Sequence, residues 1–285
     1  MDETTRRRAI DLYDRFTHGA IGRRTFMARM VALAGSLAAA ESLIAGIAAS
    51  PAAAAIVPAN DKRLATRTQL IDGYQAYVAE PRSRALRATV LVIHENRGLN
   101  EHIRDVARRL ALAGFRAVAP DLLTPVGGTP ANEDAAREAI GKLDLDKAIA
   151  AGVAMLKTLA RSSRRGKVGA VGFCWGGAYV DRLAVAAGPA LAAGVSYYGP
   201  APNPAEAVKV RAPLLLHYAG LDTRVAQSAV PWVAALKKAK KILFVFTYAG
   251  VNHAFNNDTA AERYNKPAAD LAWRRTLPFL RRYLR

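Results

Sequence analysis

The chain contains a single cysteine, Cys174, in a sequence that is typical of a nucleophile. It lies in Gly172-Phe-Cys-Trp-Gly176-Gly, between a predicted strand and a predicted helix. Glycines two residues before and after a nucleophile indicate a tight turn in which a side chain would collide with neighbouring backbone. Such a turn places the sulfur at the amino end of a helix, where the helix dipole favours an anion. We interpret Cys174 as a nucleophile, although a lone cysteine is usually a small buried hydrophobic residue.

A thiol nucleophile needs a base, and the base needs a group that orients it. His253 lies in a predicted loop before the C-terminal helix, and Asp222 follows a predicted strand between the cysteine and the histidine. The order nucleophile, acid, histidine is that of α/β hydrolases. The carboxylate would hold the imidazole tautomer and offset its charge. The alternatives are a solvent-exposed loop histidine and an aspartate that caps a helix.

Residues 60–285 are predicted to form one α/β domain that positions these groups. Apolar runs predict strands, and amphipathic segments between them predict helices, including one long helix over about 132–161. Strands that alternate with helices imply a mostly parallel sheet with helices on both faces, and residues 72–80 suggest an extra antiparallel edge strand. The strands are expected at 88–93, 115–119, 168–171, 193–198, 213–218 and 242–247, and further helices at 100–113, from the end of a turn at 172–176 to about 187, at 225–239 and at 262–283.

Residues 1–55 have the pattern of an export leader. Arg23 and Arg24 precede an apolar stretch from Val31 to Ala49, and the alanines after Pro51 offer a small-residue cleavage site. The paired arginines resemble a twin-arginine signal, which predicts the export machinery as a partner and a periplasmic location, with the cytoplasm as the alternative. The stretch is a poor membrane span. It could instead be a helix that packs on the domain, and residues 4–21 also have a helical pattern.

The formal charge of +18 comes from 41 basic and 23 acidic residues that are spread along the chain. The basic runs are short and are not interleaved with aromatic residues, so nucleic acid is not an expected partner. A single cysteine excludes an intramolecular disulfide and a cysteine-rich zinc site. We expect neither a metal nor an organic cofactor.

Residues 60–285 resemble the dienelactone hydrolase family of α/β hydrolases. Four segments carry the resemblance in family order: His94-Glu95-Asn-Arg-Gly, Gly172-Phe-Cys-Trp-Gly-Gly, Gly220-Leu-Asp222 and Asn252-His253-Ala-Phe. The resemblance implies that an ester or lactone is cleaved through a thioester. It also implies that Glu95 controls when the thiolate appears, and that the backbone N–H groups of Trp175 and Asn96 form an oxyanion hole.

The sequence departs from the family where the substrate binds. Members that act on dienelactone carry a serine directly after the histidine and an arginine four residues after it, and here these positions are Ala254 and Asn257. Arg137 loosely matches the family's other substrate arginine, and Tyr198 is a candidate pocket wall. We therefore expect a small ester or lactone substrate of unassigned identity. The alternatives are a broad carboxylesterase or acyltransferase with the same triad, or a non-catalytic basic binding protein on a hydrolase scaffold.

Overall fold

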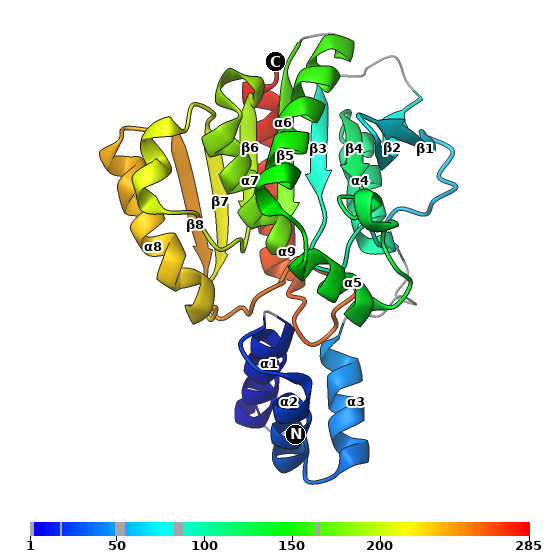
Figure 1. Ribbon diagram of the computed structural model, residues 1–285, viewed down its shortest axis with the longest axis vertical. Helices are drawn as coiled ribbons and strands as arrows, with labels where there is room; N and C mark the ends of the chain where they lie inside the picture. Colours follow the sequence, from blue (N-terminus) through cyan, green and yellow to red (C-terminus); the bar gives the residue numbers. More distant parts are fainter. Residues whose placement is uncertain (1–2, 18, 49–54, 83–87, 164–165) are drawn as a thin grey trace.

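A computed structural model describes residues 3–17, 19–48, 55–82, 88–163 and 166–285 (Figure 1). Its centre is an eight-stranded sheet with the order β1-β2-β4-β3-β5-β6-β7-β8. β1 and β2 pair antiparallel with each other, β2 pairs antiparallel with β4, and the pairs from β4 to β8 are parallel. The strands are β1 (Leu64–Ile71), β2 (Tyr74–Pro81), β3 (Thr89–Ile93), β4 (Arg116–Pro120), β5 (Val168–Phe173), β6 (Ala193–Tyr197), β7 (Leu214–Ala219) and β8 (Leu243–Tyr248).

Helices cover both faces of the sheet, as expected for parallel strands joined by helical crossovers. One face packs against α4 and α9 and the other against α6, α7 and α8, each through its own hydrophobic cluster. The helices of the domain are α4 (Glu101–Leu112), α5 (Glu133–Gly141), α6 (Leu145–Ser162), α7 (Trp175–Ala186), α8 (Thr223–Lys238) and α9 (Lys266–Tyr283), with short 3₁₀ turns at Thr124–Val126, Gly188–Ala190 and Pro204–Lys209. The α/β prediction is confirmed.

Two local predictions were wrong. The single helix expected over about 132–161 is two helices, because α5 ends at Gly141 and the Asp144 side chain caps the amide of Lys147 at the start of α6. The expected antiparallel strand is present as β2, but it does not lie at the edge of the sheet. It pairs along its length with β1, an edge strand that the sequence analysis missed. β1 has a largely exposed middle, so its apolar pattern is weak.

The N-terminal segment folds as three helices, α1 (Glu3–Thr17), α2 (Arg23–Ala34) and α3 (Leu37–Ile47). The apolar stretch bends at Gly35, which has a φ of 84°, and Ser36 caps α3. The three helices share a hydrophobic cluster formed by Ala9, Ile10, Tyr13, Phe16, Phe26, Met30, Ala40 and Ile47. They lie beyond the carboxyl ends of the parallel strands (Figure 1).

No single helix in the described part of the chain has the length and apolar character of a membrane span. α2 and α3 together meet those criteria by length and composition, with a bend of 106° between them. The region of the expected cleavage site, at residues 51–54, lies outside the described residues.

The turn from β5 to α7 leaves no space for a side chain at either of its flanking glycines. A Cβ atom on Gly172 would lie 2.0 Å from the carbonyl oxygen of Gly176, and one on Gly176 would lie 2.4 Å from that of Ile93. Both obstacles are backbone atoms, which move only if the strands move. The glycine spacing of the nucleophile motif is therefore a packing requirement of this fold.

We expect Gly172→Ala to lower the free energy of unfolding by about 3 kcal/mol or more, because the new methyl group overlaps backbone. Gly141→Ala, at the end of α5, is a matched control because nothing lies within 4 Å of its added Cβ atom. Urea denaturation of the two variants tests the difference. Equal stability of both would contradict this account of the turn.

Candidate active site

Cys174 lies in a strained turn between β5 and α7. Its backbone has a φ of 54° and a ψ of −113°, a region that non-glycine residues rarely occupy. The backbone N–H of Cys174 donates to the carbonyl of Tyr197 at 3.0 Å, which fixes the turn to β6. The residue is buried, with 4% of its surface exposed. The sulfur lies at the amino end of α7, as the sequence predicts.

His253 and Asp222 form a buried hydrogen-bonded pair. Nδ1 of His253 lies 2.5 Å from Oδ2 of Asp222, while Oδ1 of the same carboxylate accepts the Val225 N–H at 3.0 Å. Asp222 therefore caps α8 with one oxygen and orients the histidine with the other, so the two alternatives for this residue are both present. His253 also lines one small cavity with Cys174, whose side chain raises the pKa of the histidine. The three residues predicted from sequence are thus brought together.

The pair holds its charges inside the protein. Burial alone would lower the pKa of His253, but the negative charges of Cys174 and Asp222 outweigh it and raise that pKa to about 10. Burial alone would raise the pKa of Asp222, and the nearby imidazolium reverses the effect and lowers it to about 2. His253 is consequently an imidazolium at neutral pH, with an acceptor on one side and the cysteine on the other.

Glu95 lies directly after β3 and is held by two side chains. Nδ2 of Asn257 donates to Oε2 at 2.7 Å, and the Tyr198 hydroxyl donates to Oε1 at 3.3 Å. Burial, and next the Glu95 carboxylate, raise the pKa of Tyr198 well above its usual value, so the hydroxyl stays protonated. Tyr198 is fully buried. Its observed partner is therefore Glu95, and its role in substrate binding stays a prediction.

The contact between Asn257 and Glu95 is one that the sequence analysis missed. Asn257 was noted only as a departure from the family pattern. Its neutral amide holds the Glu95 carboxylate at the cavity that Cys174 also lines. The signal in the sequence was that Asn257 lies four residues after His253, at a position where the family carries a functional side chain.

The two amides assigned to an oxyanion hole lie in the two segments that meet at the cysteine. Trp175 is the first residue of α7, and Asn96 follows Glu95 after β3. Within the described residues, neither N–H donates to a backbone carbonyl. The close approach of Gly176 to the carbonyls of Ile93 and His94 brings the two segments together. The assignment of these two N–H groups to an oxyanion hole stays a prediction.

Arg137 does not reach the cysteine cavity. Its Nη1 donates to the Phe16 carbonyl of α1 at 3.3 Å, and its guanidinium lies 4.4 Å from the centre of the Phe16 ring. Its substrate role stays a prediction. The N-terminal helices also supply Tyr13 and Thr17 to the wall of the cysteine cavity. The sequence analysis did not foresee this contribution.

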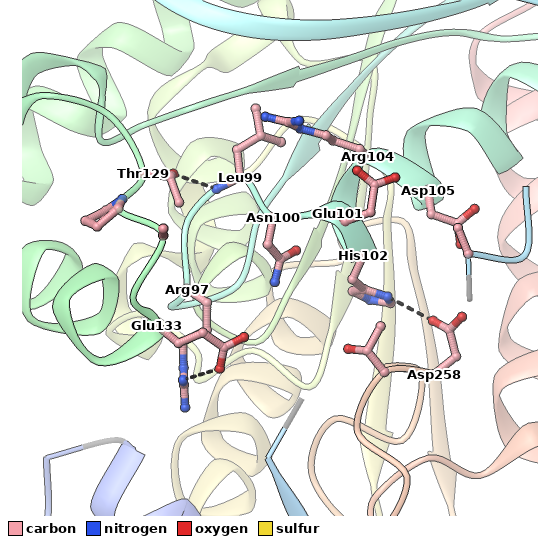
Figure 2. Close-up of a pocket in the computed structure, with 14 residues that line it drawn as sticks. Arg97, Leu99, Asn100, Glu101, His102, Arg104, Asp105, Thr129, Glu133 and Asp258 are labelled. Carbon is pink, nitrogen blue, oxygen red and sulfur yellow. Dashed lines mark hydrogen bonds and ion pairs between the residues drawn. The ribbon is translucent and has the colours of Figure 1, made fainter. Parts of the chain in front are cut away.

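Two cavities adjoin the cysteine turn. A cavity of about 20 Å³ is lined by Cys174, His253 and Glu95, and a larger one of about 260 Å³ lies beside it. Arg97 and Asn100 line both. Figure 2 shows the larger cavity, where Arg97 points to Glu133 and His102 to Asp258, contacts of 2.6 and 2.9 Å. A third cavity, of about 670 Å³, is lined by Asp222 and His253 together with residues of α1.

The other buried histidines of the domain have structural roles. His94 contacts the Glu95 carbonyl through Nδ1 and accepts the Leu122 N–H through Nε2. His217 lies between the Tyr248 and Thr276 hydroxyls, and burial lowers its pKa to about 3. Among the described residues, no group of three or more acidic, histidine or cysteine side chains could hold a metal ion.

The sheet order, the nucleophile turn and the histidine loop define an α/β hydrolase. The chain belongs to the dienelactone hydrolase family, whose model matches residues 74–284. It is therefore a hydrolase, and its family is named for a lactone, which is a cyclic ester.

Relatives support this assignment over most of the chain. It is 32% identical to a Saccharolobus solfataricus protein provisionally named carboxymethylenebutenolidase, covering 73% of this chain and 93% of that protein. An Escherichia coli K12 protein with the same provisional name is also 32% identical, over 83% of this chain and 94% of its own. A crystal structure of a provisionally assigned dienelactone hydrolase from Klebsiella pneumoniae has a TM-score of 0.70 and 28% identity, covering 77% of this chain and 99% of that one.

The charged histidine gives stability a specific dependence on pH. Folded His253 keeps its proton up to about pH 10, whereas its ordinary pKa is 6.5. Its contribution is complete below pH 6.5 and is lost as the pH rises through 10. We expect the difference in unfolding free energy between wild type and His253→Gln to shrink by at least about 1 kcal/mol from near pH 7 to near pH 10.

Urea denaturation at several pH values measures this difference. His217→Gln is the matched control, because a pKa of about 3 leaves His217 neutral in this whole range. Its difference from wild type should stay constant. A parallel shift in both variants would show that the effect does not come from the His253 charge.

Proposed function

We propose that the protein hydrolyses a small ester or lactone through a thioester on Cys174, with His253 as acid and base and Asp222 as the orienting acid. The observation that carries this proposal is the hydrogen bond from His253 to Asp222, beside a cavity that His253 and Cys174 line together after the carboxyl ends of the strands. Family membership supports the hydrolytic activity. The arrangement needs neither a metal nor an organic cofactor.

In the first half of the reaction the Cys174 thiolate attacks the carbonyl carbon. A carbon–sulfur bond forms, and the carbonyl electron pair moves to the oxygen, which the N–H groups of Trp175 and Asn96 stabilise. Collapse of this intermediate breaks the bond to the leaving oxygen, which takes the proton of the His253 imidazolium. In a lactone the leaving alcohol stays attached to the acyl group.

In the second half, neutral His253 removes a proton from water. The hydroxide attacks the thioester carbonyl, and collapse expels the Cys174 thiolate and leaves the acid product. The imidazolium that His253 regains is stabilised by Asp222. The starting ion pair is thereby restored.

We further propose that Glu95 acts on the resting cysteine. Its carboxylate lines the same cavity as Cys174 and is held by Tyr198 and Asn257. A negative carboxylate next to a thiolate makes the thiolate less stable. Glu95 must therefore be hydrogen-bonded to another group when Cys174 is reactive. The amide of Asn257 supplies such a pairing.

Cys174→Ala should lower turnover by about 10³-fold or more on a panel of lactones and aryl esters, because it removes the nucleophile. His253→Ala should have a comparable effect. Acid quenching of wild type during turnover should leave an acyl group on the peptide containing Cys174, detected by mass spectrometry. Full turnover by Cys174→Ala, with unchanged thermal stability, would reject the proposal.

We also propose that residues 1–55 direct export to the periplasm through the twin-arginine machinery. Arg23 and Arg24 are exposed at the start of α2, where such machinery can reach them. Replacing both with lysine keeps the charge and should abolish export, measured by cell fractionation. A matched double replacement of Arg7 and Arg8, exposed residues of α1, should leave export unchanged. Equal export of both variants would contradict a twin-arginine signal.

A further inference from the structure

Helix α1 lies across the mouth of the catalytic cavity. Nδ2 of Asn96, whose backbone N–H is assigned to the oxyanion hole, donates to the Thr17 carbonyl at 3.0 Å. Nη2 of Arg97 donates to the Tyr13 hydroxyl at 2.8 Å. Thr17 and Tyr13 also line the cavity that contains Cys174. The last turns of α1 thus occupy the approach to the sulfur.

The space that remains is too small for a substrate. The cavity at Cys174 has a volume of about 20 Å³, whereas a single water needs roughly 10–15 Å³ by the same measure. An ester must place its carbonyl carbon against the sulfur, so it cannot bind with α1 in this position. The N-terminal helices therefore occupy the space next to Cys174 that a substrate would need.

Arg263 is the main cation where the N-terminal helices contact the catalytic cavity. It lines the catalytic cavity, and its side chain is only 9% exposed. Three contacts join its guanidinium to the N-terminal helices. Nη1 lies 3.5 Å from Oδ1 of Asp14, Nε donates to the Ile47 carbonyl at 3.2 Å, and the group lies 5.2 Å from the centre of the Tyr13 ring. Departure of these helices would leave a guanidinium facing the cavity.

Asp14 places a carboxylate beside the catalytic histidine. It shares a second cavity wall with His253 and Asp222, and its side chain is 16% exposed. Burial raises the pKa of Asp14, while the charges of His253 and Arg263 act in the opposite direction. Burial is the larger effect, so the pKa of Asp14 is raised overall, and the two cations are what favours its charged form.

We propose that helices α1, α2 and α3 are an intramolecular inhibitor. In this proposal the Asp14 side chain contacts Arg263 at the position that an anionic group of the substrate would take. The inference rests on the proposed function and assigns the binding of that anionic group to Arg263, because Asn257 carries no charge. Arg263 is then a specificity-determining residue.

The single cysteine allows the covering role to be tested without turnover, because alkylation of the chain by iodoacetamide reports on Cys174 alone. Asp14→Arg places a second cation against Arg263 and should raise the alkylation rate of the full chain by about tenfold or more. Asp11→Arg is the matched control, with the same charge change at an exposed position of the same helix. It should stay within about twofold of wild type.

A second variant approaches the same contact from the catalytic domain. Glu262 binds the Arg6 guanidinium of α1 at 2.6 Å, so Glu262→Arg should also speed alkylation. It keeps the test decisive if Asp14→Arg folds poorly. Rates for both variants equal to that of Asp11→Arg would overturn the inhibitory role.

The anion-binding role of Arg263 is tested by comparing iodoacetate with neutral iodoacetamide. Arg263→Gln should raise the iodoacetamide rate, because the cover loosens, and lower the ratio of iodoacetate to iodoacetamide rates by about fivefold. Lys266→Gln, an exposed cation three residues away, should leave the ratio unchanged. An unchanged ratio in Arg263→Gln would overturn the assignment of the anion site.

These outcomes are distinguishable from failure of the hydrolase proposal. If the opened variants are alkylated rapidly but turn over neither neutral nor anionic esters, the cover is supported and the proposed chemistry is rejected. If they turn over esters with no change in alkylation from wild type, the chemistry is supported and the cover is rejected.

Discussion

The backbone of Cys174 is held at a positive φ of 54°, and the turn it makes places Cys174 at the cavity that His253 and Glu95 also line. A non-glycine residue in this region costs about 1–3 kcal/mol, so the surroundings must enforce it. The amide of Cys174 is bonded to β6, and Gly176 packs directly on the end of β3. The turn is thus clamped between two neighbouring strands. These contacts also fix the positions of the Cys174 side chain and the Trp175 N–H at the start of α7.

A second constraint is that the base must carry charge where water is excluded. An isolated buried imidazole would be neutral, as His217 is. His253 differs because Asp222 lies 2.5 Å away and is itself fixed by the Val225 N–H of α8. A carboxylate held by backbone cannot turn away from the ring, so the start of α8 determines the orientation of the base. The same residue type therefore has different charge states at two buried positions of one domain.

The sequence was sufficient for features that depend on local pattern. Buried parallel strands, the glycine-flanked turn and the order of cysteine, aspartate and histidine each follow from a few neighbouring residues, and the parallel sheet then brings their ends together. It was insufficient where a contact joins distant residues that carry no motif. Asn257 and Glu95 are 162 residues apart, and nothing in either segment specifies their hydrogen bond. The break before Asp144 was missed because the hydrophobic period continues across it.

The N-terminal helices illustrate that limit, because composition marked them as a separate segment but did not place them. The three helices have a hydrophobic cluster of their own. Their recorded contacts with the catalytic cavity are mainly polar, or join arginines to aromatic rings. Contacts of this kind exchange with water at lower cost than apolar packing does. The position of the helices is therefore set by a few arginines on the domain rather than by a shared core.

The junction after these helices is anchored independently of them. The amides of Ile56 and Val57 donate to the buried carboxylate of Asp105 at 3.3 and 2.7 Å, and Nε of Arg108 donates to the Val57 carbonyl at 2.6 Å. The Val57 side chain is buried in the core of the domain. Because these contacts begin at residue 56, loss of the preceding segment removes none of them. The domain is thereby built to keep its own N-terminal boundary while the helices that block its active site are displaced.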